Sequence, residues 1–459
     1  MSKILIEHAD YVVTVDPERR IIRDGAVAIV GDRIAAVGKT DRIRPDYADA
    51  EVIDGRGKMV LPGLFDTHIH GAQQLGRGLG DNMYQRFFTH LWKIESEMDE
   101  GDALCAFRLC QLELIRAGVT CFADPGNYFP GIEAQAMKES GLRGIISRTA
   151  LDVNRPGTPE RFCETTAQAL ARSEEFVAEH HNTLNGRVKA WVSMRMAFGC
   201  SDDLLRGMGA LARKHGAGII GHACSSREPT VMANMKYGMG DVARLEQLGV
   251  LGPNMLLLHM AWLGMDEVML VKERDVKVSI APGSSFHQAM GNINRGKAPE
   301  MAGLGITLSL GSDAAMSGNF LDVMRNAYLM VGGYLEARMD PKTFTPEDAV
   351  EMMTIDGARS TLWENDLGSL EAGKQADVTV LDIMRPEWQP VHNPISNLVY
   401  CAHGGCADTV IVDGRVLMRD KKVLTLNEHD LYAEARERAA VLVKRAGLES
   451  SAVPRWPMA

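Results

Sequence analysis

Residues 61–70 read Leu-Pro-Gly-Leu-Phe-Asp-Thr-His-Ile-His, an apolar β-like segment that ends in His-x-His. Side chains two positions apart in a strand point to the same face, so both imidazoles can reach one metal ion. Three later apolar segments also end in a histidine or an aspartate. The strand ends of a parallel barrel share one rim, where active sites form. The sequence therefore predicts that five side chains converge there: His68, His70, His222, His259 and Asp313.

The order of the segments predicts an α/β protein. Between residues 61 and 364, short apolar segments alternate with helical ones such as 202–215, which favours a (β/α)₈ TIM-like barrel. Residues 1–60 and 365–425 both consist of short β-rich segments, and we expect them to form one small composite β-sandwich domain from both termini. Residues 426–459 are predicted to be a C-terminal helical tail.

The composition is that of an ordinary globular enzyme. The 459 residues are 46% hydrophobic and 24% charged, and the net charge of −10 argues against a nucleic-acid or membrane partner. None of the 8 cysteines lies in a CxxC pair, which favours free thiols in a reducing compartment. The chain starts without a signal-peptide pattern and has no apolar run of membrane-spanning length. We therefore expect a cytoplasmic enzyme with a small-molecule substrate.

A family resemblance covers essentially the whole chain. Residues 61–70, the Gly-Ser-Asp at 311–313 and the stretch 368–377 (Gly-Ser-Leu-Glu-Ala-Gly-Lys-Gln-Ala-Asp) resemble the amidohydrolase superfamily. The most similar group is that of chlorohydrolases, s-triazine hydrolases and aminohydrolases. The resemblance implies a homo-oligomer, and it implies catalytic roles for Asp313 as proton acceptor and for His259 as a hydrogen-bonding partner of water or substrate. It also implies the metal ligands His68, His70, His222 and Asp313.

These ligands suit one catalytic divalent ion that acidifies a bound water. Zinc is the first expectation, although iron, manganese and cobalt accept the same ligands. Binuclear members of the superfamily carry a modified lysine on the fourth strand. Here Lys189 lies near the start of the corresponding segment, 188–195, where a solvated flank is expected. The sequence therefore favours a mononuclear site.

A second departure concerns the position three residues after His222. Aminohydrolases of the similar group carry a glutamate there, which moves a proton to a ring nitrogen, whereas this chain has Ser225. The pKa of a serine hydroxyl is too high for that role near neutral pH. Glu228 follows three residues later and is a possible replacement.

The missing glutamate shapes the functional hypothesis. Hydrolysis of a C–N bond at a carbonyl (an amide, urea or carbamate, including phenylurea- or thiocarbamate-like molecules) needs no ring protonation and is the leading interpretation. The alternative is an aminohydrolase or dechlorinase of a nitrogen heterocycle such as a purine, pyrimidine or s-triazine. A non-catalytic protein of the same fold is the remote alternative, which the complete set of ligand types opposes.

Other residues are candidates for the substrate pocket or for support of the ligands. Asp124 ends an apolar segment, and we expect it to orient a ligand histidine. The candidate substrate-binding residues lie on loops or helices near the predicted rim: Gln73, Trp92, Ser225 and His287.

Overall fold

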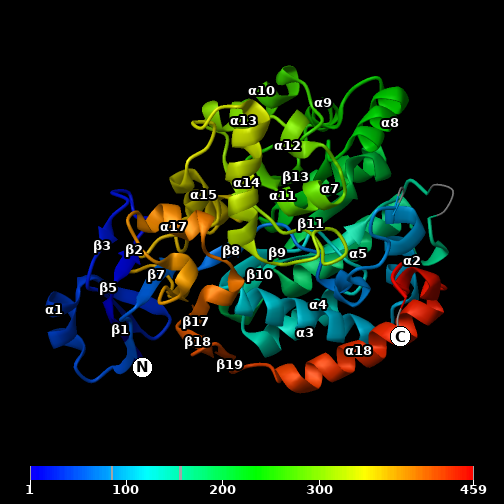
Figure 1. Cartoon of the computed structure of the whole chain (residues 1–459). Coiled ribbons are helices and arrows are strands. Elements are labelled where there is room, and N and C mark those ends of the chain that lie inside the picture. The colour runs from blue at the N-terminus through cyan, green and yellow to red at the C-terminus, as the bar shows by residue number, and fades with distance from the viewer. Residues whose placement is uncertain (1, 84–85, 155–157, 458–459) are drawn as a thin grey trace.

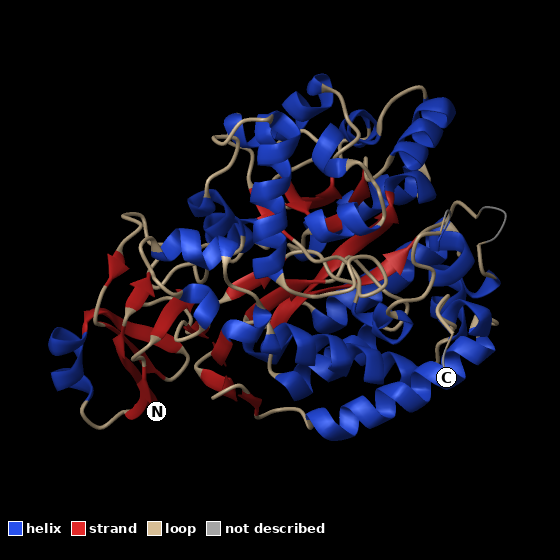
Figure 2. Cartoon of the chain, in the orientation of Figure 1, coloured by secondary structure: helices blue, strands red, loops and turns tan. Residues whose placement is uncertain are grey.

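An eight-stranded parallel sheet forms the centre of the protein (Figure 2). The computed structural model describes residues 2–83, 86–154 and 158–457. The strands pair in chain order and helices cover their outer side, which confirms the predicted (β/α)₈ barrel (Figure 1). The strands are β8 (Leu64–Asp66), β9 (Val119–Ala123), β10 (Arg143–Ala150), β11 (Val188–Met196), β12 (Ile219–Ala223), β13 (Met255–His259), β14 (Lys277–Ile280) and β15 (Leu308–Leu310).

Hydrogen bonds between the segments that follow β8 and β15 close the barrel. The amide of Thr67 donates to the carbonyl of Leu310 at 2.9 Å, and the amide of Asp313 donates to the carbonyl of His68 at 2.7 Å. Ile69 forms a parallel bridge with Asp313. β8 and β15 thus end before His68, His70 and Asp313, so the expectation that His-x-His lies within a strand is wrong in detail. Both segments nevertheless continue as extended, paired chain.

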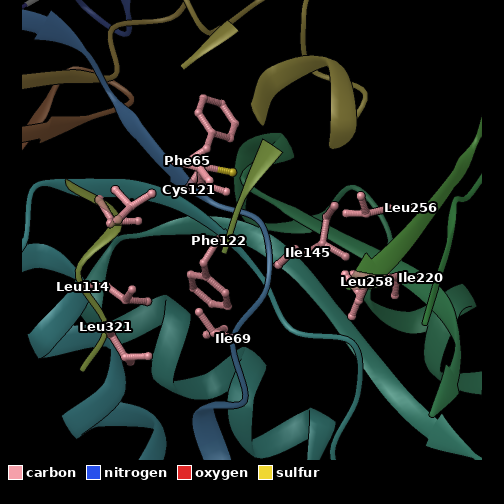
Figure 3. Close-up of a cluster of buried hydrophobic side chains, with 14 of the residues drawn as sticks. Phe65, Ile69, Leu114, Cys121, Phe122, Ile145, Ile220, Leu256, Leu258 and Leu321 are labelled. Atoms are coloured by element: carbon pink, nitrogen blue, oxygen red, sulfur yellow. The ribbon is translucent and has the colours of Figure 1, made fainter. Parts of the chain in front are cut away.

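The barrel core is apolar because both faces of a parallel sheet are covered. Phe65, Phe122, Leu256 and Leu258 are almost fully buried within it (Figure 3). Burying one such side chain contributes roughly 1.5–3 kcal/mol. These side chains make the strand ends rigid supports for the polar residues that follow them.

Capping residues define the ends of the outer helices. Asp99 forms a capping box with Asp102 at the start of α3 (Glu100–Arg116), and Ser201 caps α7 (Asp202–His215), the helix predicted at those residues. Other helices of the barrel and its loops are α2 (Trp92–Glu97), α4 (Pro130–Ser140), α5 (Thr166–His180), α8 (Arg227–Tyr237), α9 (Asp241–Gln247), α10 (Met265–Glu273), α11 (Pro282–His287), α12 (Asn292–Arg295), α13 (Ala298–Gly303), α14 (Val323–Arg338), α15 (Pro346–Met352) and α16 (Ile355–Ser360).

Strands from both ends of the chain form two further sheets beside the barrel (Figure 1). Their shared core includes Ile6 and Val27 from the N-terminal part and Val378 and Ile411 from the C-terminal part. One sheet has the order β5 (Arg33–Lys39), β4 (Gly25–Val30), β1 (Lys3–Ala9), β6 (Glu51–Asp54). The other has the order β19 (Lys422–Val423), β18 (Arg415–Arg419), β17 (Ala407–Val412), β16 (Val378–Asp382), β7 (Lys58–Pro62), β2 (Tyr11–Val13), β3 (Ile21–Ile22).

A buried ion pair joins the composite domain to the barrel. Arg143, on β10, donates from Nε to Asp377 Oδ2 at 2.8 Å, and the two side chains are 0% and 2% exposed. The carboxylate of Asp413 lies 3.4 Å from the same guanidinium. Each charge is out of water and depends on its partner.

The C-terminal helix α18 (Glu428–Arg445) runs along α3 (Figure 1). Arg438 and Arg445 both pair with Asp102, which is 2% exposed. His90, in the loop that follows β8, accepts or donates a hydrogen bond at 2.8 Å with the hydroxyl of Ser451. Across the described ranges, no helix has the length and apolarity needed to cross a membrane.

We expect Arg143→Met to lower the free energy of unfolding by about 3 kcal/mol, because it leaves the carboxylate of Asp377 buried and unpaired. Chemical denaturation measures the change. The matched control is Arg19→Met, which breaks a half-exposed pair with Glu351 and should cost about 1 kcal/mol or less. Combining Arg143→Met with Asp377→Leu should recover much of the loss, and equal losses in Arg143→Met and Arg19→Met would contradict this account.

Candidate metal centre and active site

Three histidines bring their Nε2 atoms together at the rim of the barrel. The Nε2 atoms of His68 and His70 are 3.3 Å apart, and that of His222, which lies in β12, is 3.2 Å from each of them. The carboxylate of Asp313 approaches the same point, with Oδ1 3.7 Å from His68 Nε2 and 3.8 Å from His70 Nε2. The structure thus brings the four predicted ligands together.

The triangle of nitrogen atoms fits a metal ion. Each Nε2 carries either a hydrogen or a lone pair, so at least one of the three contacts must set like against like, and hydrogen bonds alone cannot satisfy all three atoms. Nitrogen ligands about 2.1 Å from a tetrahedral ion are separated by roughly 3.4 Å, close to the distances seen here. The cluster can therefore hold one divalent ion.

The protein keeps these imidazoles neutral and correctly oriented. Burial is the largest cause that holds the pKa values of His68, His70 and His222 well below the ordinary histidine value. His222 Nδ1 donates to the carbonyl of Arg195 at 2.6 Å, which leaves a lone pair on Nε2 for a metal.

Asp313 and His259 complete the predicted catalytic pair. His259 Nε2 lies 3.8 Å from Asp313 Oδ2, and the imidazole rings of His259 and His68 are 4.9 Å apart. Both residues have left-handed backbone, with φ of 70° for His259 and 62° for Asp313. Non-glycine residues rarely adopt this conformation, and it clusters at functional sites. The surrounding structure holds both side chains toward the cluster.

The predicted role of Asp124 is wrong. Its carboxylate accepts hydrogen bonds from the backbone amides of Gly71 at 2.9 Å and Gly126 at 2.8 Å, and it does not contact a ligand histidine. Asp124 instead fixes the turn η2 (Gly71–Gly76) that begins after His70. A carboxylate at a strand end can satisfy backbone amides as readily as an imidazole, and the sequence does not distinguish these partners.

Gln73 belongs to a buried polar network that the sequence did not reveal. Its Nε2 donates to Glu95 Oε1 at 3.0 Å, and Arg195 Nη2 donates to the same oxygen at 2.9 Å. Gln73 Oε1 and Glu95 Oε2 are buried without a partner in the described part of the chain. Because Arg195 also holds His222 through its carbonyl, the network borders the metal centre. The feature of the sequence that could have indicated this network is Arg195, a charged residue between Met194 and Met196 at the end of an otherwise apolar strand.

Trp92 lies beside this network, at the start of α2. It is 3% exposed, and its ring contacts the rings of Phe87, Phe88 and Phe162. Its indole Nε1 has no hydrogen-bond partner among residues with described positions. The residue combines an apolar wall with one free donor, which is suitable for contact with a substrate.

The segment after His222 contains the two residues considered for proton transfer to a ring, Ser225 and Glu228. Ser225 is half-buried between β12 and α8, within the loop that follows the third histidine. Glu228 is exposed in the first turn of α8. Neither residue therefore provides a buried carboxylate at this position.

His287 lies at the end of α11 and interacts with residues of two other loops. It accepts a hydrogen bond from Arg86 Nη1 at Nδ1, over 3.4 Å, and its Nε2 is 3.0 Å from Asn319 Nδ2. Asp81 Oδ1 lies 3.3 Å from the same Nε2. His287 thus joins three rim loops, while its direct contact with a substrate remains a prediction.

Lys189 differs from its expected solvated position. Its Nζ donates to the carbonyl of Leu362 at 2.6 Å and lies 4.0 Å from the centre of the Trp363 ring. Burial lowers its pKa to about 8. The residue is at the start of β11, at the opposite end of that strand from the histidine cluster. It therefore provides no bridging ligand for a second metal at this centre.

Comparison with known proteins agrees with this geometry. The sequence model of the amidohydrolase family matches residues 59–417, and that of a bacterial imidazolonepropionase-like composite domain matches residues 25–50. A 5'-deoxyadenosine deaminase of Methanothermobacter thermautotrophicus is 35% identical over 92% of this chain and 95% of its own length. A 5-methylthioadenosine/S-adenosylhomocysteine deaminase of Pelotomaculum thermopropionicum is 32% identical over 97% of this chain and 100% of its own length.

Solved structures show the same fold. An adenosine deaminase from Xanthomonas campestris with bound zinc superposes with a TM-score of 0.91 at 24% identity, over 96% of this chain and 99% of its own. An atrazine chlorohydrolase from Arthrobacter aurescens TC1, complexed with zinc, gives a TM-score of 0.87 at 20% identity, over 95% and 100% of the two chains.

We expect the purified protein to bind one divalent metal ion per chain, and His68→Ala to retain much less, because it removes one corner of the nitrogen triangle. Elemental analysis after gel filtration measures the ratio. His429→Ala is the matched control, since that imidazole is 95% exposed and lies on α18, outside the ligand cluster. Two ions per chain, or equal retention in both variants, would contradict a mononuclear site at this cluster.

Proposed function

Because the chain belongs to the amidohydrolase family and is a hydrolytic enzyme that acts on carbon–nitrogen bonds other than peptide bonds, we propose that it deaminates an amino-substituted nitrogen heterocycle of the purine type. The observation that carries the proposal is the convergence of three imidazoles and Asp313 at the barrel rim. The choice of a ring amine rests on similarity along nearly the full chain to proteins named as deaminases of adenosine derivatives.

The residues of the cluster have separate tasks in this reaction. A zinc ion held by the three histidines and Asp313 would supply Lewis-acid chemistry, which lowers the pKa of water and polarises the group under attack. Asp313 takes the proton of the attacking water and passes it to the departing amine. His259 orients that water by a hydrogen bond. Burial of His68, His70, His259 and Asp313 strengthens their electrostatic interactions.

Deamination of a ring also requires a proton on the ring nitrogen beside the carbon under attack. Ser225 cannot supply it, and Glu228 is exposed. We assign this transfer to Glu95, a buried carboxylate with one unpartnered oxygen that is connected to the centre through Gln73 and Arg195. An ionised carboxylate can take a proton from water and deliver it to the ring.

Hydrolysis of an acyclic C–N bond at a carbonyl is the second candidate. The observation that favours it is the serine at position 225, since an amide, urea or carbamate needs no ring protonation. In that case the carbonyl oxygen is polarised directly, and Asp313 alone can transfer the proton to the leaving nitrogen.

A substrate panel on metal-analysed protein separates the two functions. We expect the enzyme to release ammonia from aminopurine nucleosides such as 5'-deoxyadenosine. The loss of the aminopurine absorbance measures this reaction. Phenylureas, carbamates and N-acyl arylamines should release no amine, and His68→Ala is the control for metal-dependent turnover. Release of an arylamine or alkylamine, with no ammonia from any ring, would reject the deaminase in favour of the second candidate.

Four single variants test the proton-transfer assignments with the best substrate of the panel. We expect Asp313→Asn and Glu95→Gln to lower kcat by at least about 100-fold, because each removes a proton-transferring carboxylate. Ser225→Ala and Glu228→Gln should stay within about three-fold of the wild type, since neither has such a role. A large loss of kcat in Glu228→Gln, together with an active Glu95→Gln, would mean that Glu228 is the proton donor.

A further inference from the structure

Arg86 is a buried guanidinium that the proposed reaction does not use. It lies in the loop after β8, directly before the helical turn η3 (Phe87–Leu91), and is 8% exposed. Its Nε and Nη2 atoms are buried and have no hydrogen-bond partner in the described ranges. An arginine stays charged in a protein, and a buried guanidinium with unsatisfied donors is destabilising.

The neighbours of Arg86 hold it in place without satisfying this charge. Nη1 donates a hydrogen bond to His287 Nδ1 at 3.4 Å. The nearest carboxylate oxygen, Asp81 Oδ1, is 3.7 Å from Nη2, beyond hydrogen-bond range, and also lies 3.3 Å from His287 Nε2. Asn319 Nδ2 donates to the other oxygen of Asp81 at 3.4 Å. Asp81 thus lies within 4 Å of all three side chains, and its Oδ1 forms no hydrogen bond among the described residues.

The unpartnered edge has a shape that selects carboxylates. Nε and Nη2 form one side of the guanidinium and donate two parallel hydrogen bonds. The same edge of other arginines in this chain binds a carboxylate in this way: Arg19 with Glu351, Arg108 with Glu139, and Arg143 with Asp377. For Arg86, which is buried, no carboxylate among the described residues lies within hydrogen-bond range of this edge.

The position of Arg86 links it to the metal centre. Burial is the largest influence on its pKa and lowers it, whereas the carboxylates of Asp81 and Asp313 raise it. Arg86 follows β8 and contacts His287 at the end of α11, the helix after β14, so it lies at the barrel rim that carries the metal centre. A group bound at the Nε and Nη2 edge would lie at the same rim.

We propose that the Nε and Nη2 edge of Arg86 binds a carboxylate group of the substrate. The inference rests on the proposed function, because it assumes a heterocyclic substrate and places a carboxylate on it. It makes Arg86 a specificity-determining residue and His287 a positioning residue, which orients the guanidinium from its other edge.

Direct binding of simple anions tests the site without turnover. The probes are acetate and benzoate, with acetamide and benzamide as neutral isosteres, titrated calorimetrically into the metal-loaded enzyme at constant ionic strength. We expect at least one carboxylate to bind the wild type, and to bind Arg86→Gln about ten-fold or more weakly, since two charge-assisted hydrogen bonds are lost. Arg86→Lys should be intermediate, because it keeps the charge but not the planar fork. The neutral isosteres should show no difference among the variants.

Arg42→Gln is the matched control, since that guanidinium is 84% exposed, and it should bind the carboxylates as the wild type does. Asp81→Asn should bind them more tightly, because it removes the competing negative charge. The melting temperature of Arg86→Gln without anions should equal or exceed that of the wild type.

Several results would overturn the proposal. The first is equal binding of the carboxylates by the wild type and Arg86→Gln, and the second is no binding of either carboxylate by the wild type. The third is binding that His68→Ala abolishes and Arg86→Gln retains, because it would assign the anion to the metal ion. Tighter binding of inorganic phosphate than of both carboxylates would also reject the carboxylate assignment. None of these results depends on whether the enzyme deaminates a ring, so a failure of the proposed function is detected separately by the substrate panel.

Discussion

The hydrogen bonds that join the end of β8 to the loop after β15 close the barrel and set the distances of the active site at the same time. The amide of Asp313 donates to the carbonyl of His68, and the amide of Ser312 donates to the carboxylate of Asp66 at 2.9 Å. Two ligands that are far apart in sequence are therefore fixed by backbone geometry. Side-chain rotation has little freedom left, because both ligands are buried.

The ligand cluster was predictable because the residue types and their spacing along the strands indicate metal binding. A polar side chain at the end of an apolar strand is conspicuous, and barrel topology sends all such ends to one rim. The roles of Asp124 and Lys189 were mistaken because sequence does not state which partner a buried polar group finds. Glu95 and Arg86 were missed for a related reason: both lie in loop or helical segments where charged residues are usually solvated.

Two buried arginines near the rim illustrate different solutions to the same electrostatic problem. Arg195 pairs with Glu95 at 2.9 Å and supports His222 through its backbone, so its charge is balanced within the protein. Arg86 has a carboxylate only at 3.7 Å. The first arrangement stabilises the architecture of the centre, whereas the second retains capacity to interact with a bound molecule.

The pairing of β7 with β16 has a consequence for the order of assembly. Residues 58–62 leave the ribosome before any of the barrel, but their antiparallel partner, residues 378–382, emerges only after the barrel sequence is complete. The complete seven-stranded sheet cannot form during synthesis until then, and β7 can pair only with β2 before that point. The helix α18, which packs on α3, is made later still. One edge of β7 therefore stays unpaired while the barrel sequence is being made, and an unpaired strand edge is a site where aggregation can begin.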